Sequence, residues 1–388
     1  MRLETRLVKV SERVWPDNPV SPPIYQTAAY SYRSLQQVER VLQGQEPGYT
    51  YTRGGGNPTT EELAQLMAAL EEGEGSVITA SGTGAMLAAI LALAPTPTSI
   101  YVAREIYGGT VGLVRHVLEP LGYSFVWVDT HQPEALPKYW SHRGSGILIG
   151  ETISNPRGRV SPWDAVIQAA HAHNVLVIID NTFASPFHAR PLNWGADLIV
   201  HSVTKFIGGH DDVILGAVVG SPKAIGRVQQ LVDIMGVTPD PMASWLALRG
   251  ARTLALRMER SSQNARKLAE SLTSVSGIDQ VDYPGLQFHP DYPIASRLLE
   301  HGFGAILAIH LAGGLEAVEH LVNRLHHVRL VTSLGDVSTS ISHPVVASHR
   351  ELTAEEKERV GIDEGTVRIS VGIEHIDDLI EDFRQALA

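Results

Sequence analysis

A lysine follows an apolar run in the stretch DLIVHSVTKFIGGHDD, residues 197–212. The run is typical of a buried strand, and Ser202, Thr204 and Lys205 come directly after it. A lysine is almost never fully buried unless it is paired with an acid or engaged in chemistry. Taken by itself, such a lysine is most simply explained by a salt bridge. The hydroxyl residues beside it favour a second explanation, in which the amine and the hydroxyls belong to one binding site.

A run of small residues, SGTGAM, lies between an earlier strand-like segment and a helix-like one. At a helix start, backbone N–H groups such as those of Gly82 and Thr83 favour a bound anion. Taken alone, the run is better explained as a tight strand-to-helix turn. It completes neither the GxGxxG motif nor a P-loop, so it does not specifically indicate a nucleotide.

Polar residues also follow three other strand-like segments. Asp180 ends the run VLVIID, where a carboxylate without a positively charged partner would be costly. Tyr107 lies beside two glycines and is suited to stack on a flat ligand, although a lone tyrosine is more often a packed side chain. Glu151 and Asn155 follow the run GILIG, and Asn155 could equally cap a turn.

Together these residues indicate one ligand chemistry. In an open α/β sheet, ligands bind beyond the carboxyl ends of the strands, where the acid, the lysine, the hydroxyls and the helix start would meet. They suit a flat ligand that carries a cationic ring, a phosphate and a group that reacts with an amine. Pyridoxal 5′-phosphate has these properties, because its aldehyde forms a Schiff base with a lysine and its ring nitrogen pairs with an acid. The combination favours this cofactor over a simple salt bridge.

Alternating strand-like and helix-like segments would position these residues. Continuous apolar strands separated by helices predict an α/β fold, with a mainly parallel central sheet covered by helices on both faces. The strand-like runs are 76–80, 99–103, 124–129, 146–150, 175–180, 197–201 and 213–220, and the helix-like stretches between them include 83–94, 109–121 and 162–173.

The chain is long enough for two domains. We predict an extended N-terminal arm over 1–57, which is rich in proline, glycine and tyrosine. A cofactor-binding α/β domain over 58–245 and a smaller α+β domain over 246–388 would follow. A long helix is expected over 244–275. The smaller domain would contain strands over 305–312 and 366–372 and helices over 315–325 and 376–387.

The composition excludes several classes of protein. Hydrophobic residues make up 44% and charged residues 19% of the 388, which indicates an ordinary globular protein. A net charge of −11 without a basic block argues against a nucleic-acid or anionic-membrane partner. The chain has no cysteine, which excludes disulfides and thiolate metal sites, and we expect no bound metal. No apolar run reaches the ~18 residues of a membrane span, and the N-terminus has no signal core, so we expect a cytoplasmic protein.

Ordered motifs along nearly the whole chain resemble the Cys/Met-metabolism family of pyridoxal-phosphate enzymes. This family includes cystathionine γ-synthase, cystathionine β- and γ-lyases, methionine γ-lyase and acylhomoserine sulfhydrylases. The resemblance implies a fold-type I PLP-dependent transferase. The motifs are VSPPIYQTAAY, GYTYTRGGGNPT, ASGTGAM, YGGT, ETISNP, IIDNTFASP, DLIVHSVTKFIGGH, LRMERSSQNA, YPGL, TSLGD and GTVRISVGIEHIDDLI.

The resemblance also implies roles for individual residues. Lys205 matches the Schiff-base lysine and catalytic base, and Asp180 matches the partner of the ring nitrogen. Tyr107 matches the tyrosine that stacks on the ring and exchanges protons, and Asn155 the amide near its phenolic oxygen. The residues matched to phosphate ligands are Gly82, Thr83, Ser202 and Thr204, together with Tyr51 and Arg53, which in the family reach from one subunit into the site of its neighbour.

Three residues of the C-terminal part match the substrate-binding positions of the family. Arg368 resembles the arginine that binds the substrate carboxylate, and Ser333 lies beside it. Thr332 stands where cystathionine γ-synthases and γ-lyases carry a glutamate suited to the distal amino group of cystathionine. TSLGD resembles the methionine γ-lyase type more closely, although Gly109 stands where that type commonly has cysteine.

The leading hypothesis is a methionine γ-lyase-like C–S lyase that performs α,γ-elimination. Proton loss at Cα and then Cβ would expel the thiol from Cγ, and the enamine left behind would hydrolyse to a 2-oxo acid and ammonia. The alternatives are γ-replacement on an acylated homoserine, a cystathionine β- or γ-lyase, and transamination. A non-enzymatic scaffold would be expected to lack Lys205 or Asp180. The partners we expect are a small amino-acid substrate and copies of the same chain in a homotetramer, a dimer of dimers with shared active sites.

Overall fold

The computed structural model describes residues 1–9, 15, 18–140 and 146–388. Within them, the main sheet has seven strands in the order β1-β7-β6-β5-β4-β2-β3. β7 runs antiparallel to its neighbours β1 and β6, and the other pairs are parallel. The strands are β1 (Gly75–Thr79), β2 (Ser99–Ala103), β3 (Ser124–Val128), β4 (Gly146–Glu151), β5 (Val175–Asp180), β6 (Leu198–Ser202) and β7 (Gly216–Gly220).

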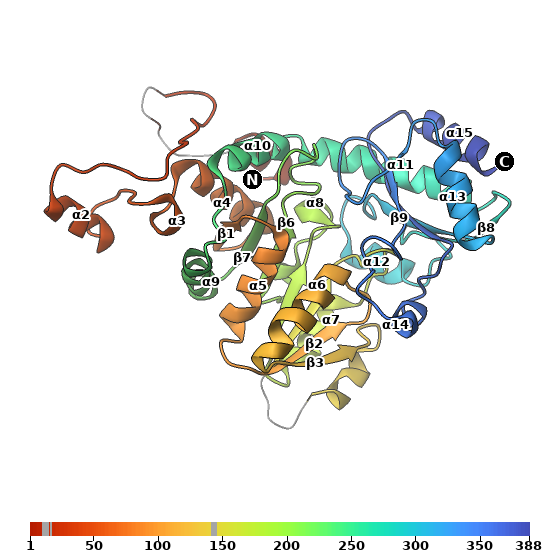
Figure 1. The fold of residues 1–388 in the computed structure, drawn as a ribbon, viewed down its shortest axis with the longest axis horizontal. Helices are drawn as coiled ribbons and strands as arrows, with labels where there is room; N and C mark the ends of the chain where they lie inside the picture. Colours follow the sequence, from red (N-terminus) through yellow and green to blue (C-terminus); the bar gives the residue numbers. More distant parts are fainter. Residues whose placement is uncertain (10–14, 16–17, 141–145) are drawn as a thin grey trace.

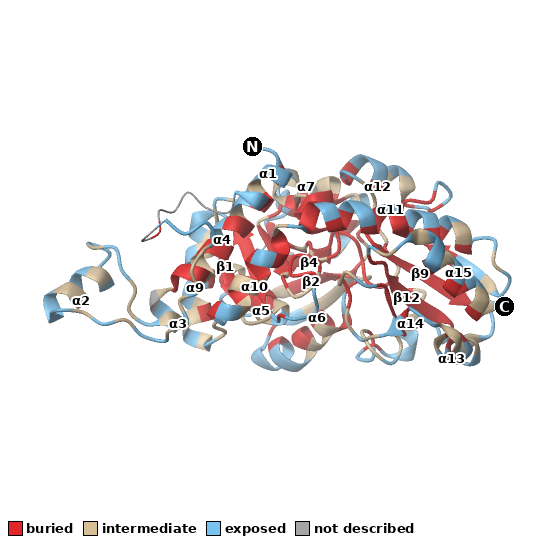
Figure 2. Ribbon diagram, turned by 90° about the horizontal axis from the view of Figure 1, so that it is seen from above, coloured by how far each residue is buried: buried red, intermediate tan, exposed pale blue. Residues whose placement is uncertain are grey.

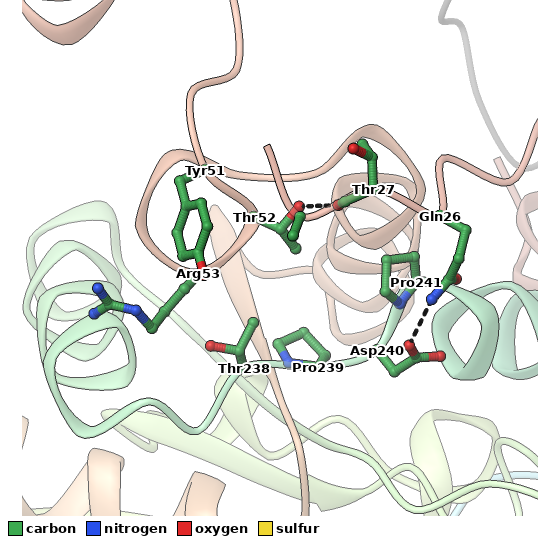
Figure 3. A pocket seen from close by; sticks show the side chains of 10 residues that line it. Gln26, Thr27, Tyr51, Thr52, Arg53, Thr238, Pro239, Asp240 and Pro241 are labelled. Carbon is green, nitrogen blue, oxygen red and sulfur yellow. Dashed lines mark hydrogen bonds between the residues drawn. The ribbon is translucent and has the colours of Figure 1, made fainter. Parts of the chain in front are cut away.

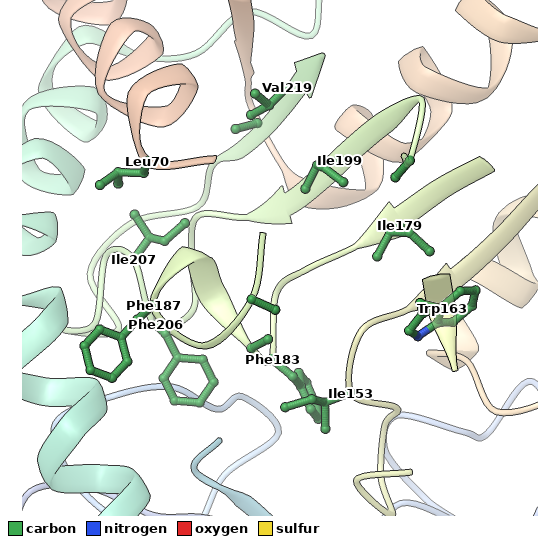
Figure 4. Packing of buried hydrophobic residues seen from close by; sticks show 14 of the residues in the cluster. Leu70, Ile153, Trp163, Ile179, Phe183, Phe187, Ile199, Phe206, Ile207 and Val219 are labelled. Atoms are coloured by element: carbon green, nitrogen blue, oxygen red, sulfur yellow. The ribbon is translucent and has the colours of Figure 1, made fainter. Parts of the chain in front are cut away.

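Helices cover both faces of this sheet, as the sequence pattern predicts (Figure 1). One face packs against α4 (Pro58–Glu71), α7 (Trp163–His171) and α10 (Pro241–Ala251). The opposite face packs against α5 (Gly82–Leu93) and α9 (Pro222–Met235). The first of these two apolar layers contains Leu70 of α4, Ile179 of β5, Ile199 of β6 and the phenylalanines drawn in Figure 4.

The alternation of strand residues decides which polar side chains face α5. Ile178 and Val200 belong to the apolar layer under α5, whereas Ile179 and Ile199 belong to the opposite layer. Because side chains alternate between the faces of a sheet, Asp180 lies on the α5 face. By the same reasoning, Ser202 on β6 faces α5. The acid and the hydroxyl that end these two core strands therefore share one face.

Short local signals begin the helices around the sheet. The Ser81 side chain accepts a hydrogen bond from the Gly84 N–H at the start of α5. Asn57 caps α4 and Asp240 caps α10, and a proline follows each cap at the first helical position. The expected helix over 109–121 begins as α6 (Gly108–Leu113) and continues as a π-helical turn over Val114–Leu118 and a 3₁₀ turn over Glu119–Leu121. Two further short helices are α8 (Ser185–His188) and α12 (Tyr292–Leu298).

A second sheet builds the C-terminal part of the molecule. Its order is β10-β11-β12-β9-β8, with bounds β8 (Ile278–Asp282), β9 (Ile306–Leu311), β10 (Arg329–Leu330), β11 (Ser340–Ser342) and β12 (Thr366–Ser370). The helices α13 (Gly314–Arg324) and α15 (Ile376–Leu387) pack on it, and α14 (Ala354–Arg359) lies in the loop before β12. The predicted strands over 305–312 and 366–372 correspond to β9 and β12, whereas the short β10 and β11 gave no recognisable sequence pattern.

The expected long helix over 244–275 is two helices. α10 ends at Ala251, and α11 (Leu254–Leu272) begins after Arg252 and Thr253. α11 extends from the main sheet toward the second sheet (Figure 1). The predicted domain boundary between residues 245 and 246 falls inside α10, and it stays a prediction.

The N-terminal segment is less uniform than an extended arm. α1 (Leu3–Val8) buries Leu3 and Leu7 in the main core. Residues 18–57 then carry the short helices α2 (Leu35–Leu42) and α3 (Thr52–Gly55), and α2 projects from the body with no buried residue (Figure 2). Among the described residues, no helix is both long enough and apolar enough to cross a membrane.

Candidate active site

A cavity of about 710 Å³ lies where β4, β5 and β6 end, between the main sheet and the C-terminal part. It brings together residues that are far apart in the sequence. Its lining includes the predicted site residues Gly82, Thr83, Tyr107, Asn155, Asp180, Ser202, Thr204, Lys205, Thr332 and Arg368. Ser333 joins this group through a hydrogen bond to Lys205.

The Lys205 amine points at a hydroxyl, and not at an acid. Its Nζ donates a hydrogen bond to Ser333 Oγ over 3.0 Å, and Ser333 Oγ donates to Asp211 Oδ1 over 3.0 Å. Among the described residues, no carboxylate forms an ion pair with Lys205. Burial lowers the pKa of the Lys205 ammonium, the charge of Arg368 lowers it further, and Asp211 acts in the opposite direction. The amine is therefore biased toward its neutral, nucleophilic form.

Asp180 is held at the end of β5 by a neighbouring threonine. The backbone N–H and the hydroxyl of Thr182 both donate to Asp180 Oδ1, over 2.9 and 2.5 Å. The same hydroxyl accepts the Ser202 backbone N–H over 2.8 Å. Burial raises the pKa of Asp180, and the hydrogen bonds from Thr182 reduce this rise. A cation placed against Asp180 would stabilise its charged form.

The start of α5 approaches the end of β6 closely. A Cβ atom at Gly82 would lie 2.9 Å from the Cβ of Ser202, so only glycine fits at this position. The first N–H groups of a helix have no partner within the helix, and here they begin beside the Ser202 hydroxyl. Thr204 also lines the cavity, and its hydroxyl joins the backbone of Leu215, donating to the carbonyl over 3.2 Å and accepting from the N–H over 3.0 Å.

Arg368 provides a buried cation on the opposite side of the cavity. It lies on β12 and is 2% exposed. Its Nη1 donates to Asn155 Oδ1 over 3.2 Å, and its Nη2 donates to the Ser333 carbonyl over 2.9 Å. Its buried Nε has no hydrogen-bond partner among the described residues. Burial lowers the pKa of Arg368 to about 10, so it remains charged at neutral pH, and a carboxylate is the ligand it is suited to bind.

The second glycine after Lys205, Gly209, makes room for an arginine of α11. Arg257 donates hydrogen bonds to the carbonyls of Phe206, Ile207 and Gly250, over 2.6, 3.2 and 2.9 Å. Gly209 has φ of +70°, and a Cβ atom there would lie 2.1 Å from Arg257 Nη1. Arg257 therefore fixes the turn that carries Lys205.

Sequence reasoning missed two supporting residues of the cavity. Thr182 follows Asp180 by two positions, and this short spacing is a signal that could have identified it as the partner of the acid. Arg257 lies in the motif LRMERSSQNA, but two of its three carbonyl partners, Phe206 and Ile207, are about 50 residues away in the chain. No local pattern could have identified that contact.

Tyr51 and Arg53 are not brought to Lys205 within this chain. They line a separate cavity of about 420 Å³ with Gln26, Thr238 and Asp240 (Figure 3). Arg53 Nη1 donates to the Asp233 carbonyl over 2.8 Å. The predicted contact of Tyr51 and Arg53 with a phosphate in a neighbouring subunit stays a prediction.

The residues of the larger cavity fit pyridoxal 5′-phosphate. Lys205 offers an amine that has no acidic partner among the described residues. Asp180 offers a carboxyl for a ring nitrogen, and the close-packed start of α5 offers N–H groups for a phosphate. When bound to an amino acid, this cofactor withdraws electrons from the bonds at Cα. Among the described residues, no group of three or more histidine, aspartate or glutamate side chains could hold a metal ion.

Comparisons with known proteins agree with this fit. An L-methionine gamma-lyase of Fusobacterium nucleatum subsp. polymorphum is 39% identical over 368 residues, which cover 94% of this chain and 92% of the relative. A cystathionine beta-lyase of Lactococcus lactis subsp. cremoris is 38% identical over 95% of this chain and 94% of its own length. The crystal structure of cystathionine gamma synthase from Xanthomonas oryzae pv. oryzae superposes with a TM-score of 0.93 and 35% identity, covering 100% of this chain and 98% of that one.

These comparisons confirm the predicted fold type, the cofactor and the class of enzyme. Residues 4–388 match the family described as Cys/Met metabolism PLP-dependent enzyme. The structural relatives have the fold-type I architecture of a central sheet covered by helices with a second, smaller sheet domain. The chain therefore belongs to the Cys/Met metabolism family of enzymes that depend on pyridoxal 5′-phosphate.

Proposed function

We propose that this enzyme is a methionine γ-lyase-like C–S lyase, which converts a γ-thioether amino acid and water into a 2-oxo acid, ammonia and a thiol. One observation carries the proposal: Arg368, whose buried Nε has no partner among the described residues, lines the same cavity as the Lys205 amine. If the substrate carboxylate binds the guanidinium of Arg368, the Cα and Cβ atoms of the amino acid face Lys205. The relatives named L-methionine gamma-lyase support the choice of substrate.

In this proposal each side chain of the cavity has its own role in the reaction. Arg368 binds and orients the substrate carboxylate. Lys205, with its lowered pKa, removes the proton at Cα and then a proton at Cβ. Tyr107 exchanges protons with the substrate amine and the leaving thiol. Asp180 pairs with the ring nitrogen of the cofactor, and Asn155 lies near its phenolic oxygen. The phosphate is bound by Gly82, Thr83, Ser202 and Thr204.

Thr332 favours a substrate whose distal end carries no ammonium group. It lines the cavity with a hydroxyl, which provides no negative charge for a distal ammonium group. Methionine satisfies this condition and cystathionine does not. The second candidate is γ-replacement on an acylated homoserine, whose acyl end also carries no ammonium. The likeness to a cystathionine gamma synthase structure supports this second candidate.

We further propose that the enzyme is a homotetramer built from dimers with shared active sites, and that it works in the cytoplasm. Within one chain, Tyr51 and Arg53 line a cavity apart from Lys205, which leaves them available to a neighbouring subunit. The position of the projecting segment around α2 supports the same assembly. Size-exclusion chromatography with light scattering tests the assembly, and fractionation of cells that produce the protein tests the location.

Product analysis tests the reaction. We expect the purified enzyme to release 2-oxobutanoate and methanethiol from methionine, and to form little thioether from O-acetyl- or O-succinylhomoserine with added thiol. Lys205→Ala should remove both this activity and the visible absorption band of the bound cofactor. Thioether formation that exceeds elimination would establish the second candidate instead. Failure to turn over any γ-substituted amino acid would refute both.

A further inference from the structure

Glu151 joins two loops of the cavity through one carboxyl group. It is the last residue of β4 and is 7% exposed. Its Oε1 accepts the backbone N–H of Tyr107 over 2.8 Å, and its Oε2 accepts the backbone N–H of Asn155 over 2.9 Å. Each oxygen is thus bonded to a different loop, one after β2 and one after β4.

The two loops hold side chains assigned to two different parts of the cofactor, the face of its ring and its phenolic oxygen. Tyr107 is the residue proposed to stack on the ring, and Asn155 is the amide proposed to lie near its phenolic oxygen. Tyr107 is 40% exposed, and among the described residues no hydrogen bond fixes its side chain. The position of its backbone therefore decides where the tyrosine ring lies. Glu151 therefore sets the separation of two groups that are both assigned to contact the cofactor.

The position of Glu151 is costly for folding, which indicates a role beyond packing. Glu151 and Asp180 are register partners in the parallel strands β4 and β5, so two carboxyl groups lie side by side in a buried site. Burial raises the pKa of Glu151 well above its usual range, and the charge of Asp180 raises it further. A glutamine would avoid the repulsion, but its amide nitrogen would meet a backbone N–H, donor against donor. Only a carboxyl group accepts from both loops.

We propose that Glu151 is a positioning residue, which seats the cofactor ring by holding the backbones of Tyr107 and Asn155 at a fixed separation. The proposal rests on the proposed function only in placing the cofactor in this cavity. Glu151 does not touch the substrate in this proposal. It acts through the two residues whose N–H groups it binds.

The choice of substitution follows from the surroundings of Glu151. The residue also lines a polar cavity of about 290 Å³ on its other side, with Glu105, His131 and Arg159. Truncation to alanine would remove part of the wall between the two cavities, and would therefore change more than the two hydrogen bonds. Glu151→Gln keeps the size of the side chain and removes one acceptor.

Asp382 offers a matched control in the C-terminal domain. Its carboxylate accepts the backbone N–H groups of His326, His327 and Val328 over 2.9, 2.9 and 3.1 Å. It lies on α15, outside the lining of the cofactor cavity. Asp382→Asn therefore breaks the same kind of bond in a place where the cofactor does not depend on it.

The experiment titrates the apoprotein of each variant with pyridoxal 5′-phosphate, and records the visible band of the holoenzyme across pH and its thermal unfolding. For Glu151→Gln we expect about tenfold weaker cofactor binding, from the loss of one buried hydrogen bond, together with a shifted band or a shifted pH midpoint. For Asp382→Asn we expect a lower unfolding temperature but unchanged cofactor binding and an unchanged band. Glu151→Asp keeps the carboxyl but is one methylene shorter, so it should lie between wild type and Glu151→Gln.

Two outcomes would overturn the positioning role. One is a Glu151→Gln holoenzyme with wild-type affinity and band, and the other is an equal change in Glu151→Gln and Asp382→Asn. If Glu151→Gln does not fold, the Glu151→Asp titration decides, and wild-type behaviour there overturns the role as well. A wild-type protein without a band that depends on Lys205 would instead refute the proposed function, so the two failures are distinguishable.

Discussion

At the scale of single residues, the cavity combines groups whose ionisation is shifted by burial in a useful direction. Burial lowers the pKa of Lys205 and raises the pKa of Asp180. A neutral amine is the form that reacts with an aldehyde and accepts a proton, so the first shift favours catalysis. Burial makes the charged form of Asp180 unfavourable until a cation lies beside it, so the site favours binding of a protonated ring nitrogen.

Arg368 provides the first prediction at this scale. Its fork-shaped guanidinium can bind a carboxylate with two parallel hydrogen bonds, whereas a lysine offers a point charge. Arg368→Lys should therefore lower kcat/KM for methionine by about 100-fold, which corresponds to roughly 2.7 kcal/mol. Steady-state kinetics check this, and the cofactor spectrum is the control, because Arg368 is assigned to the substrate. A variant with wild-type kcat/KM would remove Arg368 from substrate binding.

Thr182 provides the second prediction. Its hydroxyl donates to Asp180 and accepts the Ser202 N–H, so it joins the acid to the proposed phosphate site. Thr182→Val keeps the shape but removes both bonds. The pKa of Asp180 should rise further, because a hydrogen bond that lowers it is lost, and cofactor affinity should fall about tenfold. A pyridoxal phosphate titration measures this. Equal affinity in the two proteins would show that the hydroxyl is not needed to prepare the acid.

At the scale of elements, the sequence predicted what depends on local pattern and missed what depends on distant contacts. The apolar runs that became β5 and β6 placed Asp180 and Lys205 at strand ends, because strand periodicity is a local property. The break between α10 and α11 was not predicted, because the residues on both sides have helical spacing. The link from Arg257 to the turn after Lys205 depends on residues about 50 positions apart, so only the fold shows it.

That link between α11 and the turn gives the third prediction. Gly209→Ala puts a side chain on a backbone with φ of +70° and against Arg257 Nη1. The strain and the displaced arginine should lower the free energy of unfolding by about 2–4 kcal/mol and reduce cofactor affinity. Urea unfolding and a cofactor titration measure the two effects. Gly226→Ala is the control, because a Cβ atom at this position of α9 meets no described residue within 4 Å. It should leave cofactor affinity unchanged and raise the free energy of unfolding by at most ~1 kcal/mol, because alanine favours a helix more than glycine does.

At the scale of the whole molecule, the active site depends on how the two sheets are held together. Lys205 and Asp180 come from the main sheet, whereas Arg368, Ser333 and Thr332 come from the C-terminal part. The ion pair between Arg157 Nε and Asp282 Oδ2, at 2.7 Å, joins the loop after β4 to β8. A second pair joins Arg159 to Asp291 at 2.5 Å. These pairs, whose acids are buried, help to fix the distance from the amine to the guanidinium.

Asp282 gives a prediction about pH. Burial alone would raise the pKa of Asp282, but hydrogen bonds from His310 and Arg157 outweigh it and hold the pKa below its usual range. The folded state therefore favours the ionised acid, and its contribution is fully present above the unfolded pKa, near 4, and is lost as pH falls toward the lowered value. Asp282→Asn should lower the free energy of unfolding by about 3 kcal/mol at pH 7 and by less below pH 4. Urea unfolding at both pH values checks this, and a difference that is constant with pH would contradict it.

The assembly gives the last prediction, because the proposed site needs residues from two subunits. If Arg53 binds the phosphate in the neighbouring site, each site takes Lys205 from its own subunit and Arg53 from the other. Lys205→Ala then damages the site of its own subunit, whereas Arg53→Ala damages the site of the neighbouring subunit. A hybrid dimer would contain one site with both defects and one site with none. Mixing the two variants under conditions that exchange subunits should therefore recover about a quarter of wild-type activity by random pairing, although Lys205→Ala alone has none. If Arg53 served its own subunit, every hybrid site would carry one defect, and mixing would recover nothing beyond the residual activity of Arg53→Ala.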